Sequence, residues 1–83
     1  MAIFTRWGDE ITVSAYCGKH QPKWAGVPLI LLKVKYQDDH ERFAHPVNFK
    51  ADGGWAEIDA AVDAAPVIEL GPKELKAALK EAE

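Results

Sequence analysis

The sequence predicts an α+β fold: a four- to five-stranded, mainly antiparallel sheet that could curl toward a barrel, followed by two C-terminal helices. An apolar strand at residues 27–36, and alternating stretches on both sides of it, predict the sheet. Helical periodicity begins only after residue 51. The 83 residues suit a single domain, 1–83, with a β-rich half (1–50) and a helical half (51–83) that could hold a short strand at 67–70.

The stretch 27–36, VPLILLKVKY, is the strand around which we expect the sheet to form. One face is apolar throughout: Ile30, Leu32, Val34 and Tyr36. The other face is apolar at first and then cationic: Val27, Leu29, Leu31, Lys33 and Lys35. A strand that is apolar on both faces at one end is covered twice there, so we expect the first helix to cover that half.

The first hairpin is predicted around a two-residue turn at Gly8-Asp9, because glycine in first place is typical of a type II′ turn. This register puts Phe4 opposite Val13 and leaves Trp7 on a mostly polar face. A three-residue loop would shift the pairing by one residue and move Trp7 into the core, because a one-residue shift exchanges the two faces of a strand.

Residues 18–28, GKHQPKWAGVP, are predicted to form a long irregular loop, since two glycines and two prolines exclude a helix. The loop places Trp24 among the cationic or titratable residues Lys19, His20 and Lys23. Long loops often carry function. The alternative is that Trp24 closes one open end of the sheet as an apolar anchor.

After a polar turn at 37–41, residues 42–50 alternate and predict one further strand. Its apolar face would carry Phe43, His45, Val47 and Phe49. Pro46 cannot donate a ladder hydrogen bond, so this strand is expected at an edge or with a bulge.

Two helices are predicted in the acidic half. The first spans 53–65, capped by Asp52, and the two glycines at its start would let it begin nearer Trp55. Residues 66–70 are a strand or an extended bridge, and the second helix opens at Pro72. The apolar stripes expected to dock are Trp55, Ile58, Ala61, Val62 and Ala65 in the first helix and Leu75, Ala78, Leu79 and Ala82 in the second.

Charge is divided unequally along the chain. The net charge is −3, made of seven basic against five acidic residues in 1–50 and three against eight in 51–83. The single cysteine excludes an intrachain disulfide and is typical of a reducing compartment. The apolar run before Arg6 is too short for a signal peptide and no run would span a bilayer, so we expect a cytoplasmic protein.

Chemical motifs are sparse. A weak zinc pattern combines Cys17, His20, His40 and His45. Cys17 is more simply a small buried hydrophobe, and His45 is more simply a core histidine. No phosphate-binding loop or activated nucleophile is apparent. We therefore expect no enzyme activity and no cofactor.

Protein binding is the predicted function: a small non-catalytic domain such as an adaptor, an inhibitor or a subunit of a small assembly. Trp24 would be the anchor with Lys19, His20 and Lys23 around it, and Trp7 and Arg6 are second choices. Self-association through the last helix or the edge strand would give a homodimer. The alternative is single-stranded nucleic-acid binding, in which tryptophans stack on bases and the basic residues hold phosphates. These basic residues are Arg6, Lys19, Lys23, Lys33, Lys35, Arg42 and Lys50.

Overall fold

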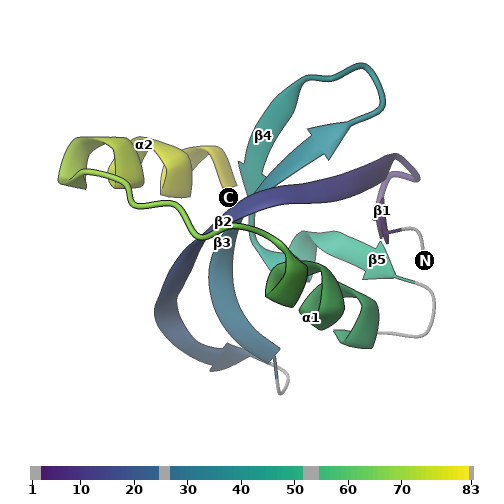
Figure 1. The fold of residues 1–83 in the computed structure, drawn as a ribbon, viewed down its shortest axis with the longest axis horizontal. Helices are drawn as coiled ribbons and strands as arrows, with labels where there is room; N and C mark the ends of the chain where they lie inside the picture. Colours follow the sequence, from purple (N-terminus) through teal and green to yellow (C-terminus); the bar gives the residue numbers. More distant parts are fainter. Residues whose placement is uncertain (1–2, 25–26, 52–54, 83) are drawn as a thin grey trace.

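The computed structural model describes the backbone of residues 3–24, 27–51 and 55–82, and the side chains in these ranges except at 19–24, 27–29 and 50–51. Its elements are β1 (Ile3–Thr5), β2 (Glu10–Trp24), β3 (Val27–Tyr36), β4 (Glu41–Ala44), the 3-10 turn η1 (Pro46–Asn48), β5 (Phe49–Ala51), α1 (Trp55–Ala64) and α2 (Pro72–Ala82). The strands form one five-stranded sheet in the order β4-β3-β2-β1-β5, and all neighbours pair antiparallel (Figure 1). The predicted α+β class is confirmed, and the sheet is open rather than a closed barrel.

The central strand β3 is covered on both faces, as its sequence predicts. Its inward face belongs to the first core, the buried residues Ile3, Ile11, Ile30, Leu32, Val34, Phe49 and Ile58. Ile58 is the buried residue of α1, and Trp55, Ala61 and Val62 of that helix pack against the same core. Four residues of the predicted stripe therefore belong to this core, whereas Ala65 follows the end of the helix at Ala64 and is not among them. The predicted cap, Asp52, and the two glycines after it lie outside the described residues.

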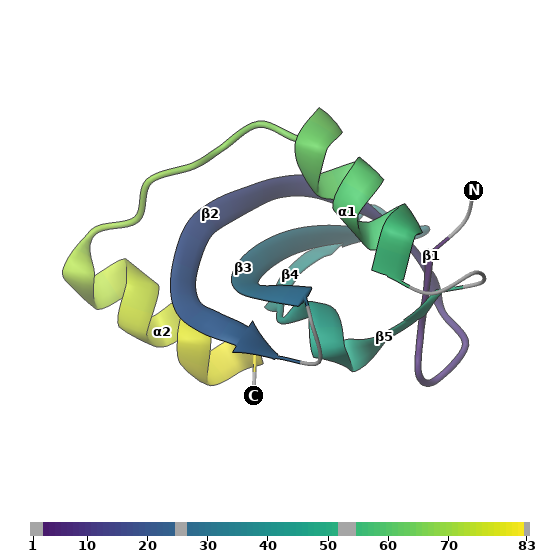
Figure 2. The same ribbon diagram turned by 90° about the horizontal axis from the view of Figure 1, so that it is seen from below.

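The opposite face of β3 is covered by α2. Leu31 is fully buried in a second core with Ala78 and Ala82. The prediction that the first helix covers the doubly apolar half of this strand is right for one face only: α1 packs on the first core, with Ile30 and Leu32, and α2 packs on the second. The two helices therefore lie on different sides of the bent sheet (Figure 2). Both helices are short and amphipathic, and their sequences do not specify which apolar face each one covers.

The predicted loop at 18–28 is also wrong, because β2 runs to Trp24 and pairs with β3 from Val27 onward. The pairing tolerates this composition through register shifts, one between Cys17 and Lys19 and one between Lys19 and Lys23. An extra residue at a bulge needs no partner in the ladder, so glycine and proline fit within such a strand. The long, curved β2–β3 hairpin is plain in Figure 2.

A third register shift in β2 lies between Val13 and Ala15. It reverses the alternation of the strand, so that Val13 and Tyr16 both pack against the first core while Cys17 packs against the second. Cys17 is therefore half-buried beside α2 instead of continuing the inward series of Ile11 and Val13.

The first hairpin has neither predicted register. Ile3 pairs with Ile11, and the Thr5 amide donates to the Asp9 carbonyl at 2.8 Å, which leaves a three-residue loop, 6–8. Gly8 has φ +93°, the left-handed conformation that closes such a loop with a bulge. Phe4 consequently lies opposite Glu10, and Ile3 and Thr5 are buried rather than on a polar face.

The predicted strand 42–50 is divided in two by Pro46. Residues 41–44 form β4, a single 3-10 turn begins at Pro46, and 49–51 form β5 beside β1. Both pieces are edges of the sheet, so the prediction of an edge is confirmed while that of one strand is wrong. The missing proline N–H and its fixed φ suit the first position of a helical turn better than a ladder.

The connection between the helices includes the predicted extended bridge. Tyr16 of β2 donates its amide to the Pro66 carbonyl at 3.0 Å and accepts from the Ile68 amide at 2.8 Å. These two bonds make an isolated parallel bridge between Tyr16 and Val67. They hold the chain against β2 between α1 and α2.

Candidate protein-binding groove

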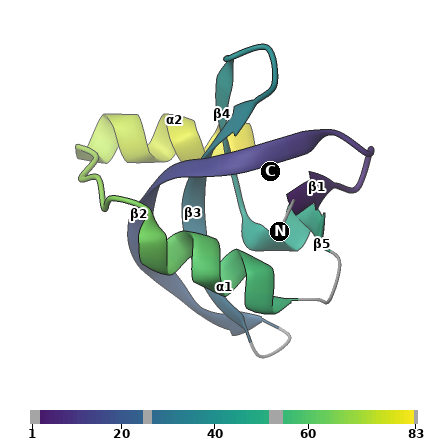
Figure 3. The same cartoon turned by 45° about the vertical axis from the view of Figure 1, so that its right-hand side comes forward.

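Two turns of the same geometry stand near each other and form a groove. In the β3–β4 turn the Tyr36 amide donates to the His40 carbonyl at 2.9 Å, and Asp39 has φ 69°, as Gly8 has its positive φ in the β1–β2 turn. Both turns project beyond the body of the sheet (Figures 1 and 3). The turn groove between them is open, has a volume of about 710 Å³ and is lined by Phe4, Trp7, Gly8, Asp9, Glu10, Tyr36, Gln37, Asp38, His40 and Arg42.

Trp7 lies at the tip of the β1–β2 turn and is 74% exposed. The turn is held below it by Thr5, whose hydroxyl oxygen accepts the amides of Trp7 at 3.3 Å and Asp9 at 3.2 Å. The guanidinium carbon of Arg6 lies 5.9 Å from the centroid of the Trp7 ring, a cation–π contact. Trp7 is thus an exposed aromatic on an ordered turn.

Arg6 connects this turn to the rest of the fold. Its Nη2 donates to the Val47 carbonyl at 2.9 Å and to Asn48 Oδ1 at 3.1 Å. The side-chain amide of Asn48 donates in turn, from Nδ2 to the Ala82 carbonyl at the end of α2, at 2.9 Å. A chain of hydrogen bonds therefore runs from the Trp7 turn through η1 to the C-terminal helix.

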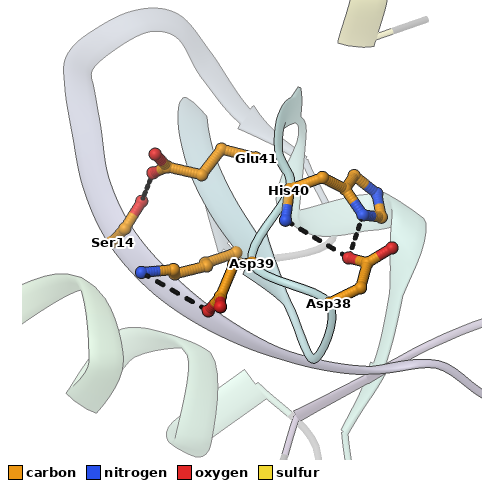
Figure 4. A network of polar contacts seen from close by, with 6 residues as sticks. Ser14, Asp38, Asp39, His40 and Glu41 are labelled. Atoms are coloured by element: carbon orange, nitrogen blue, oxygen red, sulfur yellow. Dashed lines mark hydrogen bonds and ion pairs between the residues drawn. The ribbon is translucent and has the colours of Figure 1, made fainter.

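The other side of the groove is formed by the β3–β4 turn. The rings of Tyr36 and His40 stack with centroids 4.2 Å apart and planes 10° from parallel. Asp38 Oδ1 accepts from the His40 amide at 3.2 Å and contacts His40 Nδ1 (Figure 4). Hydrogen bonding to the charged form favours that form, so these contacts lower the pKa of Asp38.

Carboxylates outnumber cations along the groove. Asp9, Glu10 and Asp38 line it, and Arg42 is the sole cation among its described lining residues if histidine is neutral. Arg42 Nε lies 3.6 Å from Glu81 of α2. Glu10 accepts from the neutral amide of Gln37 at 2.9 Å. Within the described part of the chain, neither Asp9 nor Glu10 forms an ion pair.

A further carboxylate fixes the bulge in β2. The Ser14 hydroxyl lies 2.7 Å from Glu41 Oε2 (Figure 4). It also lies 3.0 Å from the Lys33 carbonyl oxygen. The hydrogen bond from Ser14 is the largest cause that lowers the pKa of Glu41, followed among the lowering causes by the positive charges of Lys33 and Lys35. The bulge therefore has a polar contact across β3 to β4.

Of the predicted binding residues, the structure tests the location of two. Trp7 and Arg6 are exposed and adjacent, on the β1–β2 turn. The side chains of Trp24, Lys19, His20 and Lys23 lie outside the described residues, so their grouping stays a prediction. Tyr36 and Asp9 also line the groove, and they are not among the residues predicted from the sequence. The signal that could have found them is the shared loop length of the two turns.

The zinc pattern is not assembled by the described residues. Cys17 packs against the second core. His45 Nδ1 lies 3.2 Å from the Ile30 carbonyl oxygen, and His40 stacks on Tyr36 at the far turn. His20 lies outside the described side chains, and among the others no three cysteine, histidine or carboxylate residues could together hold a metal ion.

The described cations of the β-rich half do not form a row of side chains without contacts in the chain. Lys35 Nζ lies 3.8 Å from Asp39 Oδ1, and Lys33 lies 5.9 Å from the ring centroid of Phe43. Arg6 and Arg42 have the partners given above. Each of these four cations thus has a contact within the chain.

Comparisons with protein-family models, with curated proteins and with solved structures find no match for this chain. Within the residues that the structure describes, no helix is both long enough and apolar enough to cross a membrane.

Proposed function

We propose that this chain is a small non-catalytic protein-binding domain and that its binding site is the turn groove, with Trp7 as the anchor. The observation that carries the proposal is the 74% exposure of Trp7 in a groove built by two turns. Tryptophan is enriched at interface hot spots, where burial of its large apolar surface supplies binding free energy. An exposed indole at a groove offers such a surface to a partner that covers it.

The order of the turn supports this proposal. Arg6 holds the turn through Val47 and Asn48, and Thr5 accepts two of its amides. A turn that is already ordered loses less conformational entropy when it binds. Preorganisation of this kind favours a role for Trp7 in recognition over the alternative that it is a surface tryptophan without a role.

Three other predictions accompany this proposal, and they concern location, self-association and nucleic-acid binding. A cytoplasmic location agrees with the single cysteine. A homodimer would use an edge strand, β4 or β5, rather than α2, because the apolar seam of α2 is packed in the second core. Single-stranded nucleic-acid binding has less support, since Lys35 and Arg42 each lie beside a carboxylate.

A site-specific photo-crosslinking experiment tests the proposed site. A photoreactive residue replaces Gln37, which lines the groove and leaves Trp7 intact, and in the control it replaces the exposed Lys76 of α2. We expect a saturable protein adduct from position 37 only, suppressed by excess wild-type chain and not by excess Trp7→Ala. The proposal would be overturned by equal labelling from both positions or by equal competition from the two chains.

A salt titration with single-stranded DNA and RNA tests the alternative. Nucleic-acid binding would weaken steeply as salt rises, because phosphate contacts release counterions. Such binding, unaffected by Trp7→Ala, would replace the proposed function. Absence of binding at low salt would remove the alternative.

A further inference from the structure

We propose that the turn groove binds a cationic segment of its protein partner, with an arginine side chain placed between the Trp7 ring and the carboxylates of Asp9 and Glu10. This inference rests on the proposed function and adds the chemistry of the partner. It is carried by the groove's charge balance and by its aromatic lining together, not by either alone.

Charge complementarity is the first support. The groove is lined by three carboxylates, and Arg42, the one arginine or lysine among its described lining residues, lies beside Glu81. Asp9 and Glu10 form no ion pair within the described residues. A partial neutralisation of these two carboxylates by an incoming guanidinium would be favourable, and would steer the encounter.

The aromatic lining is the second support. Trp7 already accepts one guanidinium, that of Arg6, at 5.9 Å from its centroid. Arginine stacks on aromatic faces and also bonds carboxylates with its planar fork of donors, whereas lysine offers a hydrated point charge. A groove with an exposed indole next to two carboxylates therefore suits arginine better than lysine.

The dimensions agree with a side chain from an extended segment. At about 710 Å³ the groove has the size of a typical ligand site, but it is open. An open groove admits a chain that passes through it, and a volume of this size suits a few side chains rather than a whole folded surface. The partner is thus expected to present arginine on a loop or a terminus.

The test uses short acetylated and amidated peptides that alternate arginine with glycine, and matched peptides with lysine or glutamate in place of arginine. Binding is followed by the indole N–H signal of Trp7 in proton–nitrogen NMR spectra of the whole chain, assigned by its loss in Trp7→Phe. We expect saturable shifts of this signal and of the amides of residues 8–10 with the arginine peptide. The lysine peptide should bind more weakly, and the glutamate peptide should cause none of these shifts.

A charge-matched pair of double variants separates a site from general attraction. D9N with E10Q removes two carboxylates from the groove, and D59N with D63N removes two exposed carboxylates from α1, so both variants change net charge from −3 to −1. We expect about a three- to tenfold loss of arginine-peptide affinity in the groove variant and little change in the other, since exposed ion pairs each contribute modestly.

Two outcomes would overturn the inference: an equal loss in both double variants, or shifts with the arginine peptide that spare Trp7 and residues 8–10. If specific crosslinking from position 37 persists while the arginine peptide does not bind, the proposed function stands and the cationic partner falls. If neither experiment gives a specific result, both fall.

Discussion

Leu31 tests the two-sided coverage of β3, because replacing it should release one helix and not the other. The side chain is fully buried in the second core, against Ala78 and Ala82 of α2. A buried Leu→Ala change typically costs about 2–5 kcal/mol. A domain of this size has a free energy of unfolding of about 4–12 kcal/mol, so Leu31→Ala should leave it folded but weakened.

The loss should fall mainly on α2. This eleven-residue helix is marginal without docking. Beyond the second core, its described contacts with the rest of the fold include one hydrogen bond from Asn48 and the ion pair between Arg42 and Glu81. Local opening of α2 should therefore become about thirtyfold more populated or greater, while α1 keeps its place on the first core.

Amide hydrogen exchange measured residue by residue would show this difference, with Leu32→Ala as the matched variant. Leu32 is equally buried, has the same chemistry and lies in the first core on the other face. Leu31→Ala should lower protection in α2 more than in α1, and Leu32→Ala should lower it in α1 and the sheet. Equal losses in both helices for both variants would refute the two-core description.

Three further outcomes follow from the turns and the bulge. Gly8→Ala should lower the free energy of unfolding by about 1–2 kcal/mol in chemical denaturation, because φ +93° is unfavourable for alanine. Gly18→Ala should not, because Gly18 has no such positive φ and a new Cβ there would also meet no atom within 4 Å. Ser14→Ala should raise the pKa of Glu41 toward its ordinary value of 4.5 in an NMR titration. Because the pKa of Glu41 is lowered in the folded protein, the stability that this bond contributes is present above the ordinary pKa and is lost as pH falls through the folded pKa. In the Ser14→Ala variant the bond is absent, so this part of the acid destabilisation should disappear. Asn48→Asp keeps an acceptor for Arg6 but removes the donor to α2, so exchange should quicken at the end of α2 while the Trp7 indole signal stays in place.

The fold class followed from the sequence because the strongest patterns are local. The alternation of residues 27–36 and the stripe at Ile58, Ala61 and Val62 report burial directly, and the structure agrees. The register of the strands and the placement of the helices did not follow from the sequence. The bulge at Ser14 reverses the faces of β2, and no periodicity marks it.

The predicted loop at 18–28 failed for a related reason. Glycine and proline are typical of irregular chain, yet bulges in β2 absorb them and the strand continues to Trp24. Pro46 had the opposite effect: it ended a convincing alternation and began a 3-10 turn. Proline restricts a strand without specifying whether the strand bends, bulges or stops.

The groove could have been anticipated from the two turns read together. Each has three residues between paired positions and ends in a left-handed residue, Gly8 in one and Asp39 in the other. Glycine and aspartate tolerate that conformation better than most residues, so loop length and identity agree at both turns. Such a turn lifts its middle residue into solvent, and in the first turn that residue is Trp7. Placing a tryptophan there leaves its apolar surface without the benefit of burial, although the same turn would close equally well around a polar residue. Trp7 thus occupies a turn position where the backbone geometry does not require a tryptophan, and this is the physical ground on which we propose a binding role for it.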